Sequence, residues 1–366
     1  MTGLWQHMKG LLGRPTTGAG KDGPDARPSA DALLRSLAIE GKVPGLAISV
    51  LKHGRLVFEK GYGHAHLGKK VRVRPRDTIF RTASVSKPIA ATALAHAVHQ
   101  GIISLDASLY DYVPYFPKKR WDFTIRQLAN HTAGIRKYRG KEFALNLPYT
   151  IKESLVLFKD DALLFAPGTD YTYTSYDWVL ISLAIQEAAG MPFEDYVEKT
   201  VLAPLGIRHT FAPVRGAEDR VPENLHSAFL AQCYTRGRHG FRKALPVQNF
   251  YKLAGGGYLS TTADIAKFGQ AHLDGKVLDP QSLAPFLVPA HVKGESTHYG
   301  LGWQVSQDAH GRPYYGHVGS GVGGYSNLFI YPEQQMVFAI LINCTDPGVQ
   351  EVLHQAVHLL LAEPPV

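Results

Sequence analysis

The chain has 366 residues, a formal net charge of +8 and 45% hydrophobic residues, so it is long enough to bury a substantial core. Its lysines and arginines are scattered, with no run longer than Lys118-Lys119-Arg120, and no basic stripe with interleaved aromatic residues indicates nucleic-acid binding. The longest apolar stretches fall well short of the roughly 20 residues of a membrane-spanning helix. We therefore expect neither a nucleic-acid partner nor a membrane span.

Two further features concern redox state and location. Cys233 and Cys344 stand among apolar neighbours and are predicted to be buried free thiols. Residues 1–12 lack the apolar core and cleavage site of a secretory signal, and the Gly/Pro-rich stretch after them predicts a flexible N-terminal segment over 1–28. A cytoplasmic location is the default expectation, and a periplasmic or mitochondrial one stays open.

The predicted elements alternate in a way that defines the fold class. In chain order they are a helix over 31–40, strands near 44–52 and 55–63, helices near 87–100, 124–130, 151–159, 177–189, 193–200 and 262–273, strands near 299–306, 313–318, 325–331 and 336–342, and a helix over 349–361. Strands at both ends with helices between them predict an α+β fold: one antiparallel sheet flanked by helices, with an inserted all-helical lobe. A single domain over 29–362 would have an α/β lobe (about 29–83 and 205–362) and a helical lobe (about 84–204).

The stretch Ser84-Val85-Ser86-Lys87, at the start of the first long helix, is the most informative. Residues i and i+3 of a helix lie on one side, so the Lys87 amine can take the Ser84 proton and leave an alkoxide-like nucleophile. The pair Ser49 and Lys52 has the same spacing but falls in a predicted strand, where side chains three apart point to opposite faces. The spacing alone is therefore a weak signal, and it needs partners elsewhere in the chain.

Two other segments supply such partners. A Pro167-Gly168 turn leads to Tyr173 and a helix, and His317-Val318-Gly319-Ser320 precedes a glycine-rich turn between strands. With Ser84 to Lys87, these segments resemble the three motifs of the serine β-lactamase and penicillin-binding-protein family. The resemblance covers about residues 30–360. It is supported by strings at 43–45, 126–136, 154–160, 254–261 and 267–269 in the family's order.

The resemblance implies a role for each site residue. Ser84 matches the acylated nucleophile, and Lys87 and Tyr173 match the residues that share general-base duty. His317 and Gly319 fill positions of the family's Lys-Thr-Gly motif. The backbone amides of Ser84 and Ser320 would form the oxyanion hole, which acyl transfer requires.

Two positions depart from the family pattern. Ser175 stands where many members have asparagine, and it cannot offer both a donor amide and a carbonyl. His317 replaces a lysine whose charge would bind a substrate carboxylate. We therefore expect β-lactam hydrolysis to be weak, and the use of carboxylate-bearing substrates to improve as the pH falls toward about 6, where imidazole gains its proton.

Competing motifs fail on their context. Gly319 to Gly324 spells a dinucleotide-binding motif but is followed by a predicted strand, so we interpret it as a tight turn. The histidines at 64, 66 and 291–298 lack metal-ligand spacing or carboxylate companions, so neither a metal nor a cofactor is expected. His131 is interpreted as a loop-fixing residue, and Asp106 as one that organises a turn.

The sequence thus predicts a serine hydrolase that acts through an acyl-enzyme on ester or amide (peptide) bonds of a small-molecule or peptide substrate. One alternative is a β-lactamase or DD-peptidase proper. A second alternative is a homo-oligomeric, filament-forming or scaffold protein with residual hydrolase activity, because some family members form filaments.

Overall fold

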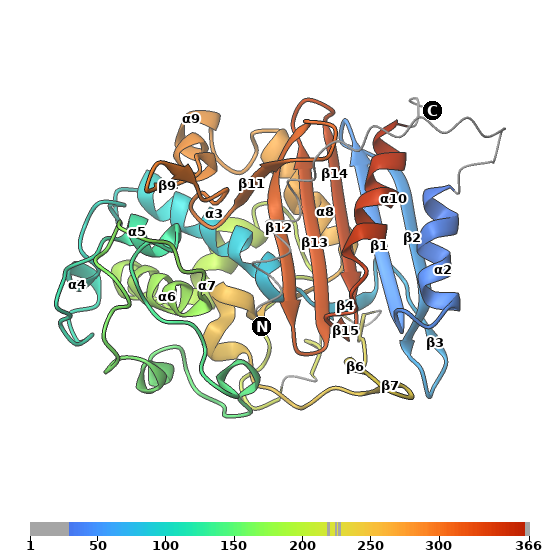
Figure 1. Ribbon diagram of the computed structural model, residues 1–366, viewed down its shortest axis with the longest axis horizontal. Coiled ribbons are helices and arrows are strands. Elements are labelled where there is room, and N and C mark those ends of the chain that lie inside the picture. Colours follow the sequence, from blue (N-terminus) through green and yellow to red (C-terminus); the bar gives the residue numbers. More distant parts are fainter. Residues whose placement is uncertain (1–28, 218–219, 224, 226–227, 363–366) are drawn as a thin grey trace.

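The structure is a computed structural model that describes residues 29–217, 220–223, 225 and 228–362 (Figure 1). The predicted flexible segment 1–28 lies outside the described residues. Seven strands form the central sheet: β1 (Gly45–Lys52), β2 (Arg55–His66), β3 (Val71–Arg72), β11 (Gln304–Gln307), β12 (Pro313–Gly321), β13 (Gly324–Tyr331) and β14 (Met336–Ile342). Their order is β11-β12-β13-β14-β1-β2-β3, and all neighbouring pairs are antiparallel. Strands from both ends of the chain therefore join in one sheet, as the sequence predicts.

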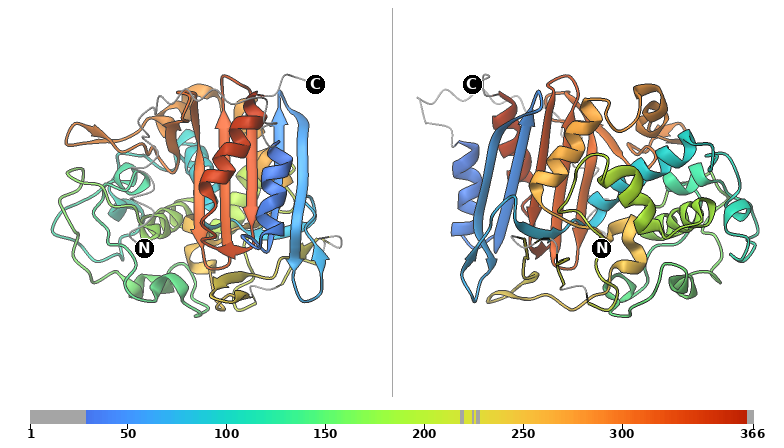
Figure 2. Two further views of the ribbon diagram at one scale, coloured as in Figure 1. Left: turned by 45° about the vertical axis from the view of Figure 1, so that its right-hand side comes forward. Right: turned by 180° about the vertical axis from the view of Figure 1, so that it is seen from behind.

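Helices cover both faces of this sheet (Figures 1 and 2). On one face, α2 (Ala30–Ile39) and α10 (Gln350–Ala362) pack against each other and bury an apolar cluster with the strands. On the other face, α8 (Thr262–Leu273) contacts β1, β13 and β14. Side-chain caps define two helix starts, because Ser29 accepts a hydrogen bond from the Ala32 amide and Thr261 accepts one from the Asp264 amide.

A group of further helices gathers beside the sheet, on the side that α8 covers (Figure 2). They are α3 (Ser86–His99), α4 (Leu109–Tyr112), α5 (Ile125–Ala129), α6 (Ser175–Ala189) and α7 (Phe193–Val197). Nearly every residue of α3 is buried, and so is the N-terminal two thirds of α6, as expected of helices that are apolar all round. The class is therefore α+β with an inserted helical lobe, as predicted.

Shorter elements complete the fold. They are β4 (Thr78–Arg81), β5 (Phe229–Leu230) and β8 (Leu259–Ser260) in one small sheet, β6 (Tyr234–Gly237), β7 (Gly240–Lys243) and β15 (Cys344–Thr345) in another, the pair β9 (His291–Val292) and β10 (Glu295–Ser296), α9 (Pro280–Leu283), and the single turns η1 (Ala83–Val85), η2 (Glu142–Ala144), η3 (Glu153–Leu157), η4 (Glu198–Leu202), η5 (Phe250–Lys252), η6 (Leu253–Gly257) and η7 (Ala284–Leu287).

Three local expectations need correction. The strand predicted near 299–306 begins only at Gln304, because the segment before it forms a turn in which Gly302 has a φ of +85°. The helix predicted near 151–159 is the short 3₁₀ turn η3. Cys344 is buried and free as expected, but Cys233 is only half-buried, because it lies in the loop before β6.

Two sequence interpretations are confirmed. Ser49 is a buried residue of β1, and its hydroxyl is directed as a donor at Glu59 and Thr262. The glycine-rich segment 319–324 joins β12 to β13 by a tight turn. In the part of the chain that the structure describes, no helix is long and apolar enough to cross a membrane.

A close approach between α8 and the sheet yields a stability prediction. A Cβ at Gly269 would lie 2.6 Å from Val337 Cγ1 and 3.1 Å from Leu328 Cδ1. Overpacking costs about 1–3 kcal/mol, whereas replacing glycine by alanine in a helix gains only about 1 kcal/mol. We therefore expect Gly269→Ala to lower the free energy of unfolding by up to about 2 kcal/mol in urea titrations.

The double variant Gly269→Ala/Val337→Ala is the control. Removing the valine methyl groups makes room for the new Cβ, so the double variant should lose less stability than the sum of the two single variants. A Gly269→Ala protein that is more stable than the wild type would contradict the close approach.

Candidate active site

Ser84 lies in η1, a single turn that runs directly into α3. The spacing of three residues therefore works as predicted, although the helix proper begins only at Ser86. Lys87 Nζ lies 3.2 Å from Ser84 Oγ. Ser84 is half-buried, whereas the Lys87 side chain is fully buried. The hydroxyl is thus accessible from outside, and the amine touches it from within.

The Lys87 amine has three oxygen neighbours. It donates to the Gly255 carbonyl at 2.6 Å and lies 3.4 Å from Ser175 Oγ, in addition to Ser84. Burial lowers the pKa of Lys87 to about 7, the charge of Lys252 acts in the same direction, and Asp177 opposes the shift. A substantial fraction of Lys87 is therefore neutral near pH 7, which a general base requires.

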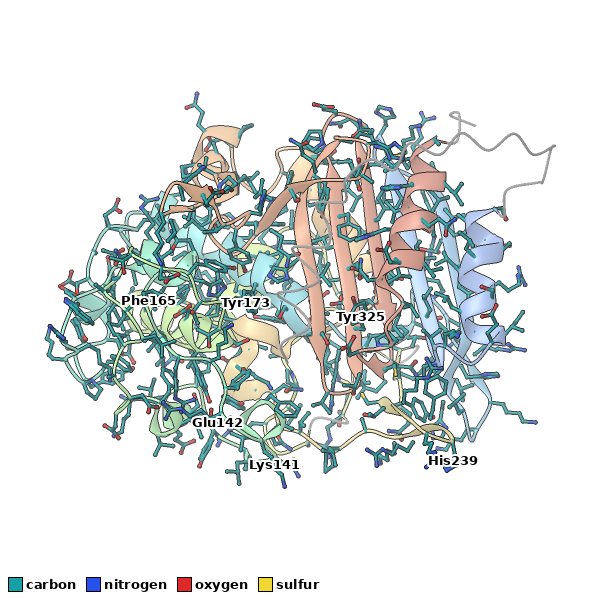
Figure 3. All side chains as sticks on the ribbon, viewed as in Figure 1. Lys141, Glu142, Phe165, Tyr173, His239 and Tyr325 are labelled. Carbon is teal, nitrogen blue, oxygen red and sulfur yellow. The ribbon has the colours of Figure 1, made fainter. Side chains whose placement is uncertain are left out.

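Tyr173 approaches the same hydroxyl from the segment before α6. Its hydroxyl donates to Ser84 Oγ at 2.9 Å, and Lys87 Nζ lies 4.7 Å from the centre of its ring. Figure 3 shows Tyr173 between the sheet and the helical lobe. Burial raises the pKa of Tyr173 above its usual value, so the phenol is protonated at neutral pH and acts first as a proton donor.

Ser175 is the first residue of α6, whose start is fixed by Thr174. The Thr174 hydroxyl accepts a hydrogen bond from the Tyr176 amide and donates one to the Arg136 carbonyl. This cap turns Ser175 toward Lys87. The smaller serine hydroxyl thus reaches the amine at the position where many family members carry asparagine.

His317 lies in β12 behind Tyr173, with the ring centres 6.0 Å apart. Its Nδ1 lies 2.7 Å from the Val318 carbonyl, and its Nε2 lies 3.0 Å from the Tyr299 hydroxyl. Only 1% of the residue is exposed, and burial lowers the pKa of His317 to about 3. The expectation that this imidazole gains a proton near pH 6 is therefore wrong: it stays neutral throughout the physiological range.

Gly319 and Ser320 border the turn that carries Ser84. A Cβ at Gly319 would lie 2.7 Å from the Ser84 amide nitrogen and 2.8 Å from the Thr82 carbonyl oxygen. Only a residue without a side chain permits this approach of β12 to η1. Ser320 follows directly along the strand and is half-buried. The edge of the sheet thus lies against the backbone of the predicted nucleophile.

The structure therefore brings Ser84, Lys87, Tyr173 and Ser175 into direct contact. Three residues around them were not assigned to the site from the sequence. These are Gly255, whose carbonyl accepts from Lys87, and the buried pair His131 and Asp177. The sequence does hold a signal for Asp177, because it is a carboxylate between Tyr176 and Trp178 in the mainly apolar N-terminal part of the helix.

His131 does fix a loop, as the sequence suggests. Its carbonyl accepts a hydrogen bond from the Thr172 amide, and its amide donates to the Leu128 carbonyl. Its ring nitrogen Nδ1 also lies 2.6 Å from Asp177 Oδ2. The side chain consequently does more than hold the backbone.

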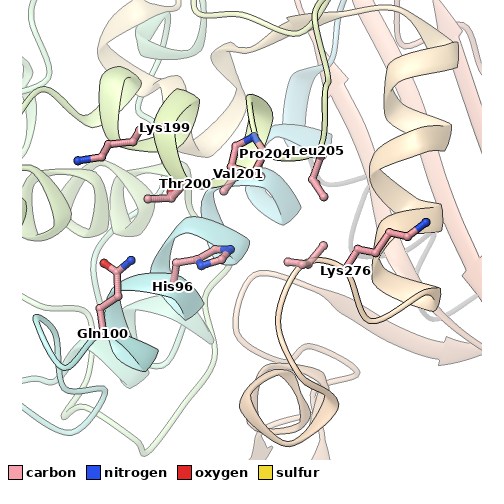
Figure 4. Close-up of a pocket in the computed structure, with 9 residues that line it drawn as sticks. His96, Gln100, Lys199, Thr200, Val201, Pro204, Leu205 and Lys276 are labelled. Atoms are coloured by element: carbon pink, nitrogen blue, oxygen red, sulfur yellow. The ribbon is translucent and has the colours of Figure 1, made fainter.

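A separate pocket of about 360 Å³ lies at the far end of α3 (Figure 4). It is lined by His96, Gln100, Lys199, Thr200, Val201, Pro204, Leu205, Lys276 and Val277. His96 lies ten residues after Ser86, about 15 Å along the helix, and none of the site residues lines this pocket. Lys276 extends away from His96 in Figure 4 and pairs with Asp274. The pocket is thus distinct from the candidate active site.

Among the described residues, no cluster of three or more His, Cys, Asp or Glu side chains is arranged to hold a metal ion. The groups around Ser84 and Lys87 are the lysine amine, the hydroxyls of Tyr173 and Ser175, and the Gly255 carbonyl. This set of groups is suited to acyl transfer by a serine nucleophile.

Comparison with known proteins identifies the family. A family model described as Beta-lactamase matches residues 30–363. The mitochondrial serine beta-lactamase-like protein LACTB of Homo sapiens is 25% identical over 402 residues, which cover 84% of this chain and 72% of that protein.

Solved structures share the fold. The octameric penicillin-binding protein homologue from Pyrococcus abyssi has a TM-score of 0.79 at 24% identity, with 92% of this chain and 77% of that chain covered. The D-amino acid amidase from Ochrobactrum anthropi SV3 has a TM-score of 0.78 at 22% identity, with 90% and 98% covered. Since the family model matches most of the sequence and the fold agrees with it, the chain belongs to the beta-lactamase family of serine hydrolases.

Proposed function

We propose that this protein hydrolyses ester or amide bonds through an acyl-enzyme formed on Ser84. The observation that carries the proposal is that Lys87 Nζ and Tyr173 Oη both lie within hydrogen-bond distance of Ser84 Oγ, at 3.2 and 2.9 Å. The amine is fully buried, and its lowered pKa leaves it neutral in part at pH 7. A nucleophile, a proton acceptor and a proton donor thus meet at one atom.

Acylation begins with neutral Lys87. The amine takes the proton from Ser84 Oγ as the oxygen attacks the substrate carbonyl, and the carbonyl oxygen becomes an oxyanion. The amides of Ser84 and Ser320 are the proposed donors to that oxyanion, which fits the close approach of β12 at Gly319. Each such donor contributes about 10²–10³ in rate in comparable enzymes.

Collapse of the tetrahedral intermediate needs an acid for the leaving group. The protonated phenol of Tyr173 lies beside Ser84 Oγ and gives its proton to the departing alcohol or amine. The tyrosine then regains a proton from the Lys87 ammonium, whose nitrogen lies against its ring. Water then attacks the carbonyl carbon of the acyl-enzyme, and the same proton transfers run in reverse. The carboxylic acid is released and the Ser84 hydroxyl is restored.

The charges of the site favour some substrates over others. His317 is neutral and both its nitrogens are engaged within the protein, so this position offers no cation to a substrate carboxylate. Esters and amides recognised through other groups are therefore the proposed substrates. The amide alternative is in keeping with the D-amino acid amidase that shares the fold. Hydrolysis of β-lactams or of carboxyl-terminal D-peptides is the second candidate, and it rests on the family alone.

A homo-oligomer is the proposed assembly. An octameric relative has the same fold, which supports self-association of this chain. A filament or scaffold role with residual hydrolysis is compatible with this assembly. A filament or scaffold role predicts weak turnover, even though Ser84, Lys87 and Tyr173 are all present.

The function is tested by covalent labelling. A fluorophosphonate should add once, to the peptide that contains Ser84, because Ser84 Oγ displaces fluoride from phosphorus with the help of Lys87. Intact mass spectrometry should show one adduct in the wild type and none in Ser84→Ala. Ser49→Ala is the matched control and should label as the wild type does, because Ser49 lies in a strand. An adduct that survives in folded Ser84→Ala would overturn the assignment.

Lys87→Met keeps the length of the side chain but removes the base. Labelling should slow by at least about 100-fold, the scale of a positioned general base. In the wild type, the labelling rate should rise as the pH rises through about 7, because the neutral amine is the active form. Lys52→Met changes the lysine that has the same spacing from Ser49 in β1, and this variant should retain both the labelling rate and the pH profile. A rate for Lys87→Met within a few-fold of wild type would mean that another group is the base.

Substrate preference follows from the neutral His317. The kcat/KM for p-nitrophenyl acetate should exceed that for nitrocefin, whose carboxylate finds no cation at this position. Because the pKa of His317 is about 3, nitrocefin hydrolysis should not rise between pH 7 and pH 5.5. A nitrocefin rate that exceeds the ester rate, or that climbs toward acid pH, would favour the β-lactamase alternative.

A further inference from the structure

Two short hairpins of the chain are rich in positive charge. Residues 60–76, which include the β2–β3 hairpin, and residues 224–263, which include the β6–β7 hairpin, contain no aspartate or glutamate. The basic residues of the first segment are Lys60, Lys69, Lys70, Arg72, Arg74 and Arg76. Those of the β6–β7 hairpin are Arg236, Arg238, Arg242 and Lys243. The two groups are far apart in the sequence, so they form one surface only if the fold brings them together.

Hydrogen bonds hold the two hairpins side by side. The Leu67 amide donates to the Tyr234 hydroxyl at 2.8 Å, across a sequence separation of 167 residues. The Gln232 amide donates to the Ala65 carbonyl at 2.8 Å. Both hairpins lie at the lower edge of Figure 1, and Figure 3 shows His239, from the turn of the second hairpin, at that edge. The fold thus gathers basic residues that the sequence scatters.

Most of these cations have no counter-charge within the protein. Arg74 pairs with Asp77 at 3.1 Å and Arg76 with Glu59 at 2.6 Å. The exposed basic residues that form no ion pair with a carboxylate of the described residues are Lys69, Lys70, Arg72, Arg236, Arg238, Arg242 and Lys243. Such neighbouring like charges repel one another and do not stabilise the fold. An anionic partner from outside would remove that repulsion.

Exposed aliphatic side chains lie beside the cations. The segment 244–249 leaves β7 and follows the same edge in Figure 1. Within it, Leu245 is 65% exposed, and the Gln248 amide donates to the Leu145 carbonyl at 2.8 Å. Leu147, from that neighbouring loop, is 44% exposed. We call the two hairpins with the segments 145–148 and 244–249 the basic surface.

We propose that the basic surface binds the face of an anionic lipid bilayer, with its lysines and arginines against the headgroups and its two leucines at the boundary of the acyl chains. A basic residue close to such a bilayer raises the partition coefficient about five-fold. Exposed aliphatic side chains add to the binding, because they leave water when they enter the interfacial region. This role does not depend on the reaction at Ser84.

The leucines favour a bilayer over a nucleic acid as the partner. Proteins that bind single strands stack bases on aromatic side chains, whereas the large apolar side chains most exposed on the basic surface are Leu147 and Leu245. A phosphate backbone offers no apolar layer for such side chains. A bilayer surface offers both the negative charge and the apolar layer.

Vesicle binding tests the charges. The full chain should sediment with vesicles of phosphatidylcholine that contain about 30% phosphatidylserine, and at least about ten-fold less with phosphatidylcholine alone. Binding should weaken as the salt rises from about 0.1 M to about 0.5 M, because salt screens the exposed charges. The variant Arg238→Gln/Arg242→Gln/Lys243→Gln should bind about 100-fold more weakly, since three basic residues are lost.

A second triple variant controls for net charge. Arg55→Gln/Lys118→Gln/Arg120→Gln removes three exposed cations, from the start of β2 and from the helical lobe, and should bind within about three-fold of wild type. Circular dichroism checks that each variant is folded. An equal loss in the two triple variants would overturn the inference, because binding would then follow net charge alone. So would a wild-type protein that does not bind the anionic vesicles at low salt.

The leucines distinguish a bilayer from another polyanion. Leu147→Ser/Leu245→Ser should weaken vesicle binding about ten-fold, because apolar area no longer leaves water. The same variant should bind a fluorescent DNA duplex as the wild type does. Vesicle binding unchanged in this variant, or wild-type binding to the duplex tighter than to the vesicles, would overturn the bilayer as partner. A wild-type protein that binds vesicles but takes no fluorophosphonate label would overturn only the proposed function.

Discussion

A primary amine that is completely buried, and that must gain and lose a proton in the proposed mechanism, determines the arrangement of this molecule's centre. Removing an ammonium group from water costs several kcal/mol, and Lys87 recovers part of that cost through the Gly255 carbonyl and nearby hydroxyls. Those groups come from the turn before α3, from η6 and from the start of α6. The site therefore exists only where these three segments meet, and α3 and α6 are buried to hold them there.

The same constraint explains why glycines stand at two points where the backbone approaches Ser84 and Lys87. Gly319 lets the edge of the sheet touch the Ser84 turn, and Gly255 offers its carbonyl to the amine, with no side chain in the way. The sheet contributes strand β12, and the helical lobe contributes Lys87, Tyr173 and Ser175, which include the groups proposed to transfer protons. Ser84 is thus half-buried at the surface of this arrangement, whereas Lys87 is fully buried beneath it.

Local and long-range features differ in how far they could be predicted. Helical spacing predicts the Ser84–Lys87 pair, and strand alternation excludes the pair of Ser49 with Lys52, since both rules concern neighbouring residues. Tyr173 is predicted only through the family resemblance, because nothing local separates it from Tyr171. The neutrality of His317 and the contact of His131 with Asp177 depend on burial by distant segments, and a sequence pattern does not encode such burial directly.

The pairing of β1 with β14 has a consequence for synthesis of the chain. Leu46 lies opposite Ile342, so partners in the middle of the sheet are separated by roughly 300 residues. At about 5–20 residues per second, a ribosome makes β14 some 15–60 seconds after β1. During that interval β1 has β2 on one side and an open hydrogen-bonding edge on the other, along an apolar strand. The nascent chain therefore passes through a state that can pair with other strands, and a chaperone that covers this edge would raise the yield of folded protein.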